Sequence, residues 1–226
     1  ACIVDGAMLA FGKMVRFRHN DMSDLGAKLA ANTASGGRLV ATDGVFSMSG
    51  AIADLPSLLT AAKAGGARVL VDDAHSVGVL GDTGAGTAEH FGVTDQVDLI
   101  TATFSKSFAC IGGYVAGGKE VINFIRHKAR SFIFSASMPP SAVATVIAAL
   151  DVMQAEPERR EQLWRNAKIM HEGLRSLGFD IGDTQTPVVP IMIGDDMKAF
   201  TFWRALFDAG IFANVAVSPA VPPDTA

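Results

Sequence analysis

Polar side chains that could carry out chemistry follow three apolar segments of the sequence, each at the point where the segment ends. The apolar segments are residues 38–42, 68–71 and 97–101. The polar groups after them are, in chain order, Asp43 and Ser47, then Asp72, Asp73 and His75, then Thr103, Ser105 and Lys106. In open α/β sheets, ligands bind beyond the carboxyl ends of the strands. If the three segments are neighbouring strands, the sequence therefore predicts one shared site.

Lys106 indicates which chemistry such a site could support. A lysine at a strand end, desolvated and flanked by hydroxyl groups, can form a Schiff base with a carbonyl cofactor. A carboxylate suits a protonated pyridine nitrogen, and that pairing keeps pyridoxal phosphate an electron sink. Hydroxyl groups can bind a phosphate or a phenolic oxygen, and His75 can bind that oxygen or assist proton transfer. The set predicts a pyridoxal 5'-phosphate site.

Each of these residues also has a purely structural interpretation. Asp43 could cap a turn, and one of Asp72 and Asp73 could cap a helix or form an ion pair. His75 could be an ordinary loop histidine, and Lys106 alone could be a surface lysine. The functional interpretation is favoured because all three groups stand at equivalent places, each after a predicted strand.

Other kinds of site match the sequence less well. It contains no phosphate-binding loop of the Gly-x-x-x-x-Gly-Lys-Ser/Thr type and no dinucleotide-binding Gly-x-Gly-x-x-Gly. A Gly-x-Ser-x-Gly nucleophile elbow is also missing. No group of cysteines and histidines has the spacing of zinc ligands, so no metal site is predicted. A divalent cation at Asp72, Asp73 and His75 remains the minor alternative.

Strands and helices must alternate to bring the three polar groups together. The sequence predicts helices at 4–11, 22–32 and 55–64, and strands at 14–17, 38–42, 68–71, 97–101 and 114–116. Asn20 or Asp21 can cap the second helix, and Pro56 suits the first turn of the third. This order predicts right-handed parallel crossovers and an α/β layered fold.

The second half of the chain predicts longer helices and a second domain. The expected elements are helices at 119–127, 141–154, 157–177 and 197–209, an extended segment at 131–137, and strands at 188–193 and 211–217. We expect a large domain with a mainly parallel sheet over residues 1–155. Residues 156–226 are expected to form part of a small α+β domain.

Composition limits the classes of protein to which the chain can belong. Of its 226 residues, 49% are apolar and 19% charged, which allows a sizeable core. The net charge of −4 argues against nucleic acid as a partner. No run approaches the roughly 18 apolar residues of a membrane span. Cys2 and Cys110 form no disulfide framework, which favours a reducing, cytoplasmic compartment. Because the chain starts without methionine, we expect a piece of a longer protein.

Three motifs resemble those of the α-oxoamine synthases, which are pyridoxal-phosphate enzymes of the aspartate aminotransferase fold (fold type I). They are Val-Asp-Asp-Ala-His-Ser-Val-Gly-Val-Leu-Gly at 71–81, Thr-Phe-Ser-Lys-Ser-Phe at 103–108 and Ile-Phe-Ser-Ala-Ser-Met-Pro-Pro at 133–140. Residues 18–21 and 42–48 fit the same family, so the resemblance runs over essentially the whole chain. Residues 18–22 and 105–108 look most like those of bacterial serine palmitoyltransferases.

The resemblance implies a role for three residues in catalysis and cofactor binding. Lys106 looks like the lysine that holds the cofactor and moves the proton at the substrate α-carbon. Asp72 looks like the partner of the pyridine nitrogen. His75 looks like the hydrogen-bond donor to the cofactor's 3-oxygen.

Further residues are implied around the cofactor. Thr103 looks like a phosphate ligand, Ser47 would lie near the 3-oxygen, and Asp43 stands where many members carry glutamate. In the family, a hydroxyl group from the second subunit also reaches the phosphate. Ser135 and Ser137 flank Ala136 at that place, so their role is left open. The family's ring-stacking histidine, glycine-rich phosphate turn and carboxylate-binding arginine would all fall outside the chain, so we expect little or no catalysis from this piece alone.

The family's reaction joins an amino acid to an acyl-CoA, with loss of CoA and carbon dioxide, and gives an α-amino ketone. The resemblance favours serine and a long-chain acyl-CoA as substrates, and a homodimer with the site at the subunit interface. The alternatives are 8-amino-7-oxononanoate synthase, 2-amino-3-ketobutyrate CoA ligase, a non-catalytic partner subunit of the same fold, or a plain aminotransferase.

Overall fold

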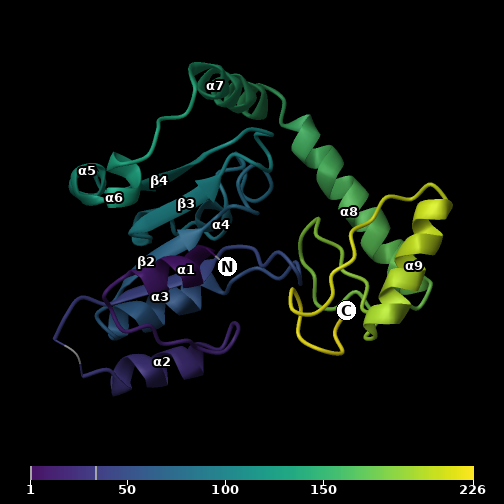
Figure 1. The fold of residues 1–226 in the computed structure, drawn as a ribbon, viewed down its shortest axis with the longest axis horizontal. Coiled ribbons are helices and arrows are strands. Elements are labelled where there is room, and N and C mark those ends of the chain that lie inside the picture. The colour runs from purple at the N-terminus through teal and green to yellow at the C-terminus, as the bar shows by residue number, and fades with distance from the viewer. Residues whose placement is uncertain (1, 34) are drawn as a thin grey trace. The chain divides into compact units, whose positions relative to one another are not determined.

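The computed structural model describes residues 2–33 and 35–226, and it divides the chain into two compact units (Figure 1). The first unit comprises Ala1–Phe46 and Ile52–Arg160, and the second comprises Ser47–Ala51 and Glu161–Ala226. Ala1 and Ala34 belong to the predicted large domain but lie outside the described residues. The domain boundary expected at residue 155 stays a prediction.

A mixed, mostly parallel sheet lies at the centre of the first unit. Its strands, in spatial as well as chain order, are β1 (Leu39–Asp43), β2 (Arg68–Asp72), β3 (Leu99–Thr103) and β4 (Gly113–Gly117). The first three strands are parallel to one another, and β4 runs antiparallel to β3. The predicted α/β fold with a mainly parallel sheet is therefore confirmed.

The alternation of side chains along β1 and β2 places every second residue on a covered face of the sheet. Val40 and Thr42 are buried in β1, and Val69 and Val71 are buried in β2, whereas the residues between them are less covered. Successive side chains of a strand point to opposite faces. The last residue of each strand therefore lies on the face opposite the buried valines.

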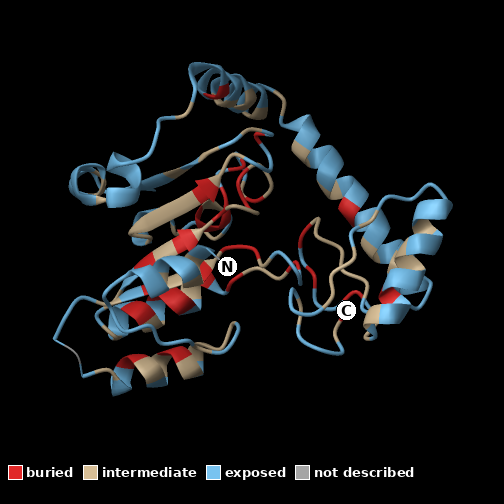
Figure 2. Ribbon diagram, in the orientation of Figure 1, coloured by how far each residue is buried: buried red, intermediate tan, exposed pale blue. Residues whose placement is uncertain are grey.

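Two helices cover the valine face. They are α2 (Met22–Ala31) and α3 (Leu55–Ala64), close to the predicted ranges. Their Leu25, Leu29, Leu55, Leu58, Leu59 and Ala62 form one core cluster with the strand valines. Figure 2 shows this burial as red segments on the strands and on both helices. Asp21 and Asp54 cap the two helices, each through a backbone N–H three residues on.

The other helices of the first unit are short until the chain reaches α7. They are α1 (Cys2–Leu9), α4 (Thr87–His90), the 3₁₀ helix η1 (Thr94–Gln96), α5 (Lys119–Lys128), α6 (Arg130–Ile133) and α7 (Pro140–Ala155). Because α6 occupies part of 131–137, the prediction of an extended segment there is wrong. A strand expected at 14–17 is also not formed. The adjacent Arg18 N–H instead donates to the Asp24 carboxylate, which satisfies it without a partner strand.

The second unit has the two helices that were expected but not the strands that were expected beside them. The long α8 (Glu158–Ser176) leads into it, and α9 (Asp196–Asp208) lies within it. No strand is assigned among the described residues 47–51 and 161–226, so the strands predicted at 188–193 and 211–217 are not formed. The Ile193 and Gly194 N–H groups donate to the Ala226 carbonyl, and the Ala213 carbonyl accepts from Trp203. These contacts use backbone groups that a ladder would need.

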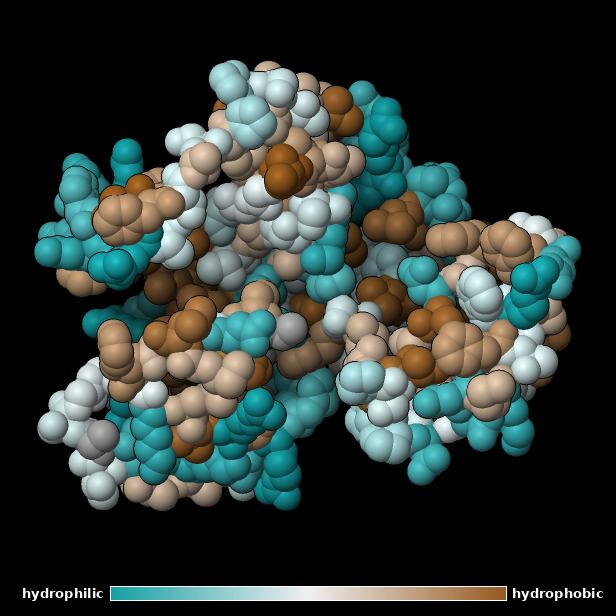
Figure 3. All heavy atoms as spheres, in the orientation of Figure 1, coloured by the Kyte–Doolittle hydropathy of each residue, from teal (hydrophilic) through white to brown (hydrophobic). Residues whose placement is uncertain are grey.

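Apolar side chains also lie on the surface of both units, as the brown spheres in Figure 3 show. Phe124 in α5 is 63% exposed, and Phe212 after α9 is 81% exposed. The core therefore does not contain all of the large apolar side chains of the chain. Within the described residues, no helix has the length and apolar character that crossing a bilayer requires.

Candidate functional site

The carboxyl ends of β1, β2 and β3 bring the predicted polar groups to one edge of the sheet. Asp43 pairs in register with Asp72, and Asp72 pairs with Thr101, two residues before Thr103. Because parallel partners in register point to the same face, the Asp43 and Asp72 side chains lie side by side on the face away from the buried valines. The structure therefore brings Asp43 and Asp72 together at the ends of β1 and β2.

Asp72 presents a half-buried carboxylate at this edge. Its Oδ1 atom accepts a hydrogen bond from the Ala74 N–H at 3.0 Å. Its Oδ2 atom accepts from the Cys2 thiol at 3.5 Å. The Ala74 contact fixes the direction of the carboxylate from within its own turn. Cys2 was not singled out from the sequence, since only the fold brings α1 to β2.

Asp73 points the other way and is fully buried. It continues the alternation of Val69 and Val71, and its N–H donates to the Thr101 carbonyl at 2.7 Å. Its Oδ2 atom accepts from the Thr87 N–H, the first residue of α4, at 3.1 Å. The sequence left open which aspartate would serve a helix end, and the structure shows that it is Asp73.

His75 follows two residues later in a half-buried position. Burial lowers the pKa of its imidazole, and the positive charge of Lys106 lowers the pKa further. The Asp72 carboxylate acts in the opposite direction but does not reverse the shift. The imidazole is thus biased toward its neutral form, which has one N–H donor and one acceptor nitrogen.

Lys106 lies in the loop that joins β3 to β4. The Phe104 N–H donates to the Gly112 carbonyl at 2.9 Å, the Cys110 N–H to the Phe104 carbonyl at 2.8 Å and the Ala109 N–H to the Lys106 carbonyl at 2.9 Å. Ser107, the next residue, donates its hydroxyl group to the Val77 carbonyl at 2.6 Å. The lysine loop is thus bonded to the turn that follows His75, while the Lys106 side chain remains exposed.

The boundary of β3 differs from the prediction by two residues. The sequence favoured a strand at 97–101, whereas β3 begins at Leu99 and ends at Thr103. The Asp98 carboxylate accepts from Arg68 at 2.9 Å and from the Val69 N–H at 2.8 Å. These contacts hold the chain at the entrance to the strand, and Thr103 is the last residue of the strand because it still pairs with Gly113 of β4.

Asp43 belongs to the same electrostatic group. Burial raises the pKa of its carboxyl, the negative charge of Asp72 adds to the increase, and the positive charge of Lys106 partly offsets it. The charges of Asp72 and Lys106 therefore act on the pKa values of both Asp43 and His75.

Thr103 and Ser47 are placed less simply. The Thr103 hydroxyl donates to the Gly112 carbonyl at 3.2 Å and accepts from the Ser105 N–H at 3.2 Å, so it already holds the lysine loop. Binding a phosphate would require its proton to turn away from Gly112. Ser47 is exposed and belongs to the second unit, so its predicted place near the cofactor stays a prediction.

Ser135 and Ser137 are both exposed. Ser135 donates its hydroxyl group to the Ser131 carbonyl, within the turn that follows α6. Nothing in this contact assigns a role in binding to either serine, so both stay open.

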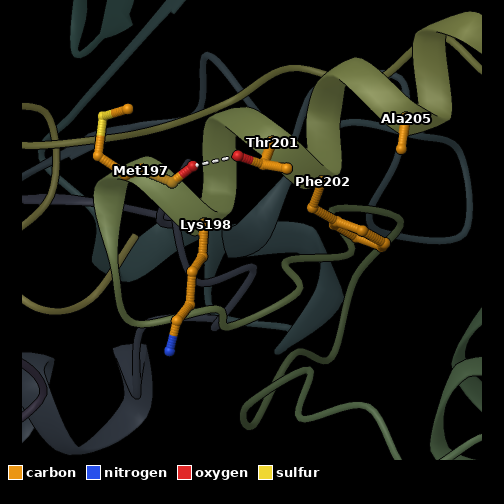
Figure 4. A pocket seen from close by; sticks show the side chains of 5 residues that line it. All are labelled: Met197, Lys198, Thr201, Phe202 and Ala205. Atoms are coloured by element: carbon orange, nitrogen blue, oxygen red, sulfur yellow. Dashed lines mark hydrogen bonds between the residues drawn. The ribbon is translucent and has the colours of Figure 1, made fainter.

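A surface hollow is present in each unit. In the first, a hollow of about 480 Å³ is lined by Ser107, Phe108 and the α7 residues Ala149 and Met153, with Arg160 also in its wall. In the second, a hollow of about 460 Å³ is lined by Met197, Lys198, Thr201, Phe202 and Ala205. Figure 4 shows that these five side chains all come from α9. Their mainly apolar character offers little for catalysis, so the strand ends remain the candidate site.

Comparisons with known proteins give a consistent result. A family model described as aminotransferase class I and II matches residues 2–225. The serine palmitoyltransferase of Sphingobacterium spiritivorum is 49% identical over 224 residues, which cover 99% of this chain and 56% of that protein. The 8-amino-7-oxononanoate synthase of Thermoanaerobacter pseudethanolicus is 42% identical over 227 residues, which cover 100% of this chain and 58% of that protein. The chain spans about half the length of the curated relatives it matches.

Solved structures show the same fold. A high-resolution structure of SPT (serine palmitoyltransferase) with a PLP internal aldimine has a TM-score of 0.95 and 40% identity, covering 100% of this chain and 57% of that one. An 8-amino-7-oxononanoate synthase of Francisella tularensis has a TM-score of 0.80 and 24% identity, covering 95% of this chain and 62% of that one, and this shows likeness of fold alone. The predicted aspartate aminotransferase-like fold and the resemblance to serine palmitoyltransferases are confirmed.

Proposed function

The chain belongs to the aminotransferase class I and II family, and from this premise we propose that the full-length protein is a pyridoxal-phosphate-dependent acyltransferase. It joins an amino acid, with serine favoured, to a long-chain acyl-CoA and releases CoA and carbon dioxide, leaving an α-amino ketone. Serine palmitoyltransferases from four bacteria are 43–49% identical to this chain. The observation that carries the proposal is that Asp43 and Asp72 lie in register at the strand ends, where the charge of Lys106 acts on both Asp43 and His75.

The side chains at the strand ends fit pyridoxal phosphate. An exposed lysine amine, a carboxylate held from one side and a neutral imidazole match the cofactor's aldehyde, its pyridine nitrogen and its 3-oxygen. Lys106 would hold the aldehyde carbon, Asp72 the pyridine nitrogen and His75 the 3-oxygen. When bound, the cofactor supplies an electron sink that stabilises negative charge at the substrate α-carbon.

The chain's own residues supply proton transfer and orientation. Lys106 Nζ accepts and returns the proton at the substrate α-carbon. Its loop is held by the Ser107 hydroxyl group, which donates to the Val77 carbonyl in the turn after His75. Asp72 Oδ1 accepts from the Ala74 N–H, so Oδ2, which now accepts from the Cys2 thiol, would be the oxygen that holds the pyridine nitrogen. His75, kept neutral, can donate one hydrogen bond without adding a second positive charge beside Lys106.

Thr103, Ser47 and Asp43 complete the proposed cofactor-binding set. Thr103 would bind the phosphate from the start of the lysine loop, and Ser47 would lie near the 3-oxygen. Asp43 pairs in register with Asp72. Burial and the adjacent Asp72 carboxylate raise the pKa of the Asp43 carboxyl, which disfavours its ionised form.

A second candidate is an 8-amino-7-oxononanoate synthase activity of the same reaction class. The 42% identity to the Thermoanaerobacter pseudethanolicus enzyme favours it. The two differ in the amino acid and acyl-CoA consumed, and none of the residues at the strand ends discriminates between these substrates. A non-catalytic partner subunit is disfavoured by the intact Lys106.

The test measures CoA release by the full-length protein over a panel of amino acids and acyl-CoAs. We expect release to be fastest with serine and a long-chain acyl-CoA. The Lys106→Ala variant should lose the visible absorbance that pyridoxal phosphate gains on binding a lysine, and its rate should fall by at least about 10²-fold. Lys63→Ala, in the last turn of α3, is the matched control.

Three results would contradict the proposal in different ways. Faster release with another amino acid would overturn the serine assignment. Amino-group exchange with a keto acid and no CoA release would indicate an aminotransferase. A wild-type protein with no cofactor absorbance would indicate a non-catalytic subunit. The homodimer with its site at the subunit interface and the cytoplasmic location stay predictions, and sedimentation of the full-length protein tests the first.

A further inference from the structure

Asp73 is a buried ionisable side chain that the proposed chemistry does not use. It is 0% exposed, and its Oδ1 atom has no hydrogen-bond partner among the described residues. Burial raises the pKa of its carboxyl. Burying a carboxyl group with an unpaired oxygen costs free energy, which other contacts of the residue must offset. The remaining hydrogen bonds of Asp73 are such contacts.

The hydrogen bonds of Asp73 join three segments of the first unit. Its Oδ2 atom accepts from Thr87 N–H at 3.1 Å, at the start of α4, where the preceding Gly86 has no side chain to cap the helix. Its carbonyl accepts from the N–H groups of Ser76 and Val77, both at 3.0 Å. The Thr87 hydroxyl donates to the Ser76 hydroxyl at 2.8 Å, which closes the link between α4 and the turn at 73–77.

Two glycines press against the same carboxyl group. A Cβ atom added at Gly44 would lie 2.2 Å from Asp73 Oδ1, and one added at Gly86 would lie 2.3 Å from Oδ2. Gly44 directly follows Asp43, so the Asp73 side chain lies beneath the ends of both β1 and β2. With backbone on both sides, the carboxyl group has little freedom to move.

We propose that Asp73 is the positioning residue of the candidate site, which holds the turn that carries Asp72 and His75. This inference rests on the proposed function. Asp72 is joined to Asp73 directly and has its carboxylate oriented by the Ala74 N–H of the same turn. In the sequence, His75 lies between Asp73 and the two residues, Ser76 and Val77, whose N–H groups donate to the Asp73 carbonyl. If the Asp73 side chain is released, both functional side chains lose their fixed relation to Lys106.

The test compares Asp73→Ala with Asp73→Asn in the full-length protein. Asparagine keeps the shape and an oxygen that accepts from the Thr87 N–H, whereas alanine leaves that buried donor unpaired. We expect Asp73→Ala to weaken pyridoxal-phosphate binding by about tenfold and to shift the pH midpoint of the cofactor's visible absorbance. Asp73→Asn should stay within about twofold of the wild type. In the cofactor-free protein, the amides of Ser76, Val77 and Thr87 should exchange hydrogen faster only in the alanine variant.

A second pair of variants keeps the test decisive if Asp73→Ala does not fold. Thr87→Pro removes the N–H that donates to Asp73, at the first residue of α4, a helical position where proline is tolerated. Thr87→Ala keeps the N–H and controls for the lost hydroxyl group. We expect Thr87→Pro to weaken cofactor binding more than Thr87→Ala does. Equal binding by these two variants would overturn the proposal.

Two further outcomes would also overturn it. One is faster amide exchange in Asp73→Ala with cofactor affinity and pH midpoint unchanged, which would make Asp73 structural only. The other is Asp73→Asn binding the cofactor as weakly as Asp73→Ala, which would show that the hydrogen bond from the Thr87 N–H to the residue 73 side chain does not position the turn. A wild-type protein without cofactor absorbance contradicts the proposed function instead, and amide exchange still tests the turn.

Discussion

At the strand ends, burial acts on two neighbouring ionisable residues in opposite directions. It raises the pKa of the Asp43 carboxyl and lowers the pKa of the His75 imidazole, because both charged forms are disfavoured away from water. The Lys106 charge lowers both pKa values, so it favours the ionised form of Asp43 and the neutral form of His75. The charge of Lys106 therefore favours a carboxylate at Asp43 and a neutral imidazole at His75 at the same time.

The first prediction concerns the protonation of His75. Its imidazole should titrate below the ordinary histidine pKa in the cofactor-free, full-length protein. Lys106→Ala removes a positive charge that disfavours imidazolium, so it should raise the His75 pKa. Asp72→Asn removes a negative charge that favours imidazolium, so it should lower that pKa. Nuclear magnetic resonance of the ring protons against pH measures both shifts, with Lys63→Ala as the control. Shifts of the opposite sign would show that the two charges do not face the ring.

At the scale of elements, local signals predicted much of the first unit. Asp21 and Pro56 marked the starts of two helices, and polar residues at the strand ends marked the candidate site, whereas the Asp54 cap was found only in the structure. The alternation of side chains in β2 also places Asp72 and Asp73 on opposite faces of the sheet. The sequence contains this pattern, and it could have shown that Asp73 is the buried member of the pair.

What could not be predicted depends on contacts between distant residues. The start of β3 moves because Asp98 binds Arg68, thirty residues away. The segments 188–193 and 211–217 have the composition of strands, but a strand exists only where another strand pairs with it. The Cys2 contact with Asp72 likewise requires the fold.

The second prediction tests helix capping in α3. The Asp54 carboxylate accepts from the Ser57 N–H at 3.2 Å, so Asp54→Ala leaves a helix donor without its partner. We expect a loss of about 1 kcal/mol in the free energy of unfolding. Asp54→Asn keeps an accepting oxygen and should change stability by only a few tenths of a kcal/mol. Urea unfolding followed by circular dichroism measures both, and equal losses in the two variants would argue against the cap.

At the scale of the whole molecule, a short segment of the early chain belongs to the late unit. Residues 47–51 leave the first unit after Phe46 and return at Ile52. Within the second unit, the Gly50 carbonyl accepts from the Thr186 hydroxyl at 3.0 Å and from the Gln185 N–H at 3.2 Å. The Thr186 contact joins residues 136 positions apart, which no local pattern could predict. Ser47, a proposed cofactor contact, is therefore carried by a segment that the second unit holds.

The last prediction tests that attachment with two alanine variants. Gly50 has a φ of 67°, and an added Cβ atom would lie 2.2 Å from the Thr184 hydroxyl and 2.7 Å from the Val188 carbonyl. Gly182, in the same unit, has a φ of 59° but open space around it, so Gly182→Ala introduces the backbone strain without the clash. We expect Gly50→Ala to cost about 1–3 kcal/mol more than Gly182→Ala.

Hydrogen exchange of the full-length protein locates this loss. The Gln185 amide donates to Gly50, so its protection should fall in Gly50→Ala and persist in Gly182→Ala. The amides of β2, such as Val71, should keep their protection in both variants because they lie in the first unit. Equal loss at Gln185 in the two variants would assign the effect to backbone strain alone. Loss at Val71 before Gln185 would show that residues 47–51 are held by the first unit, and Ser47 with them.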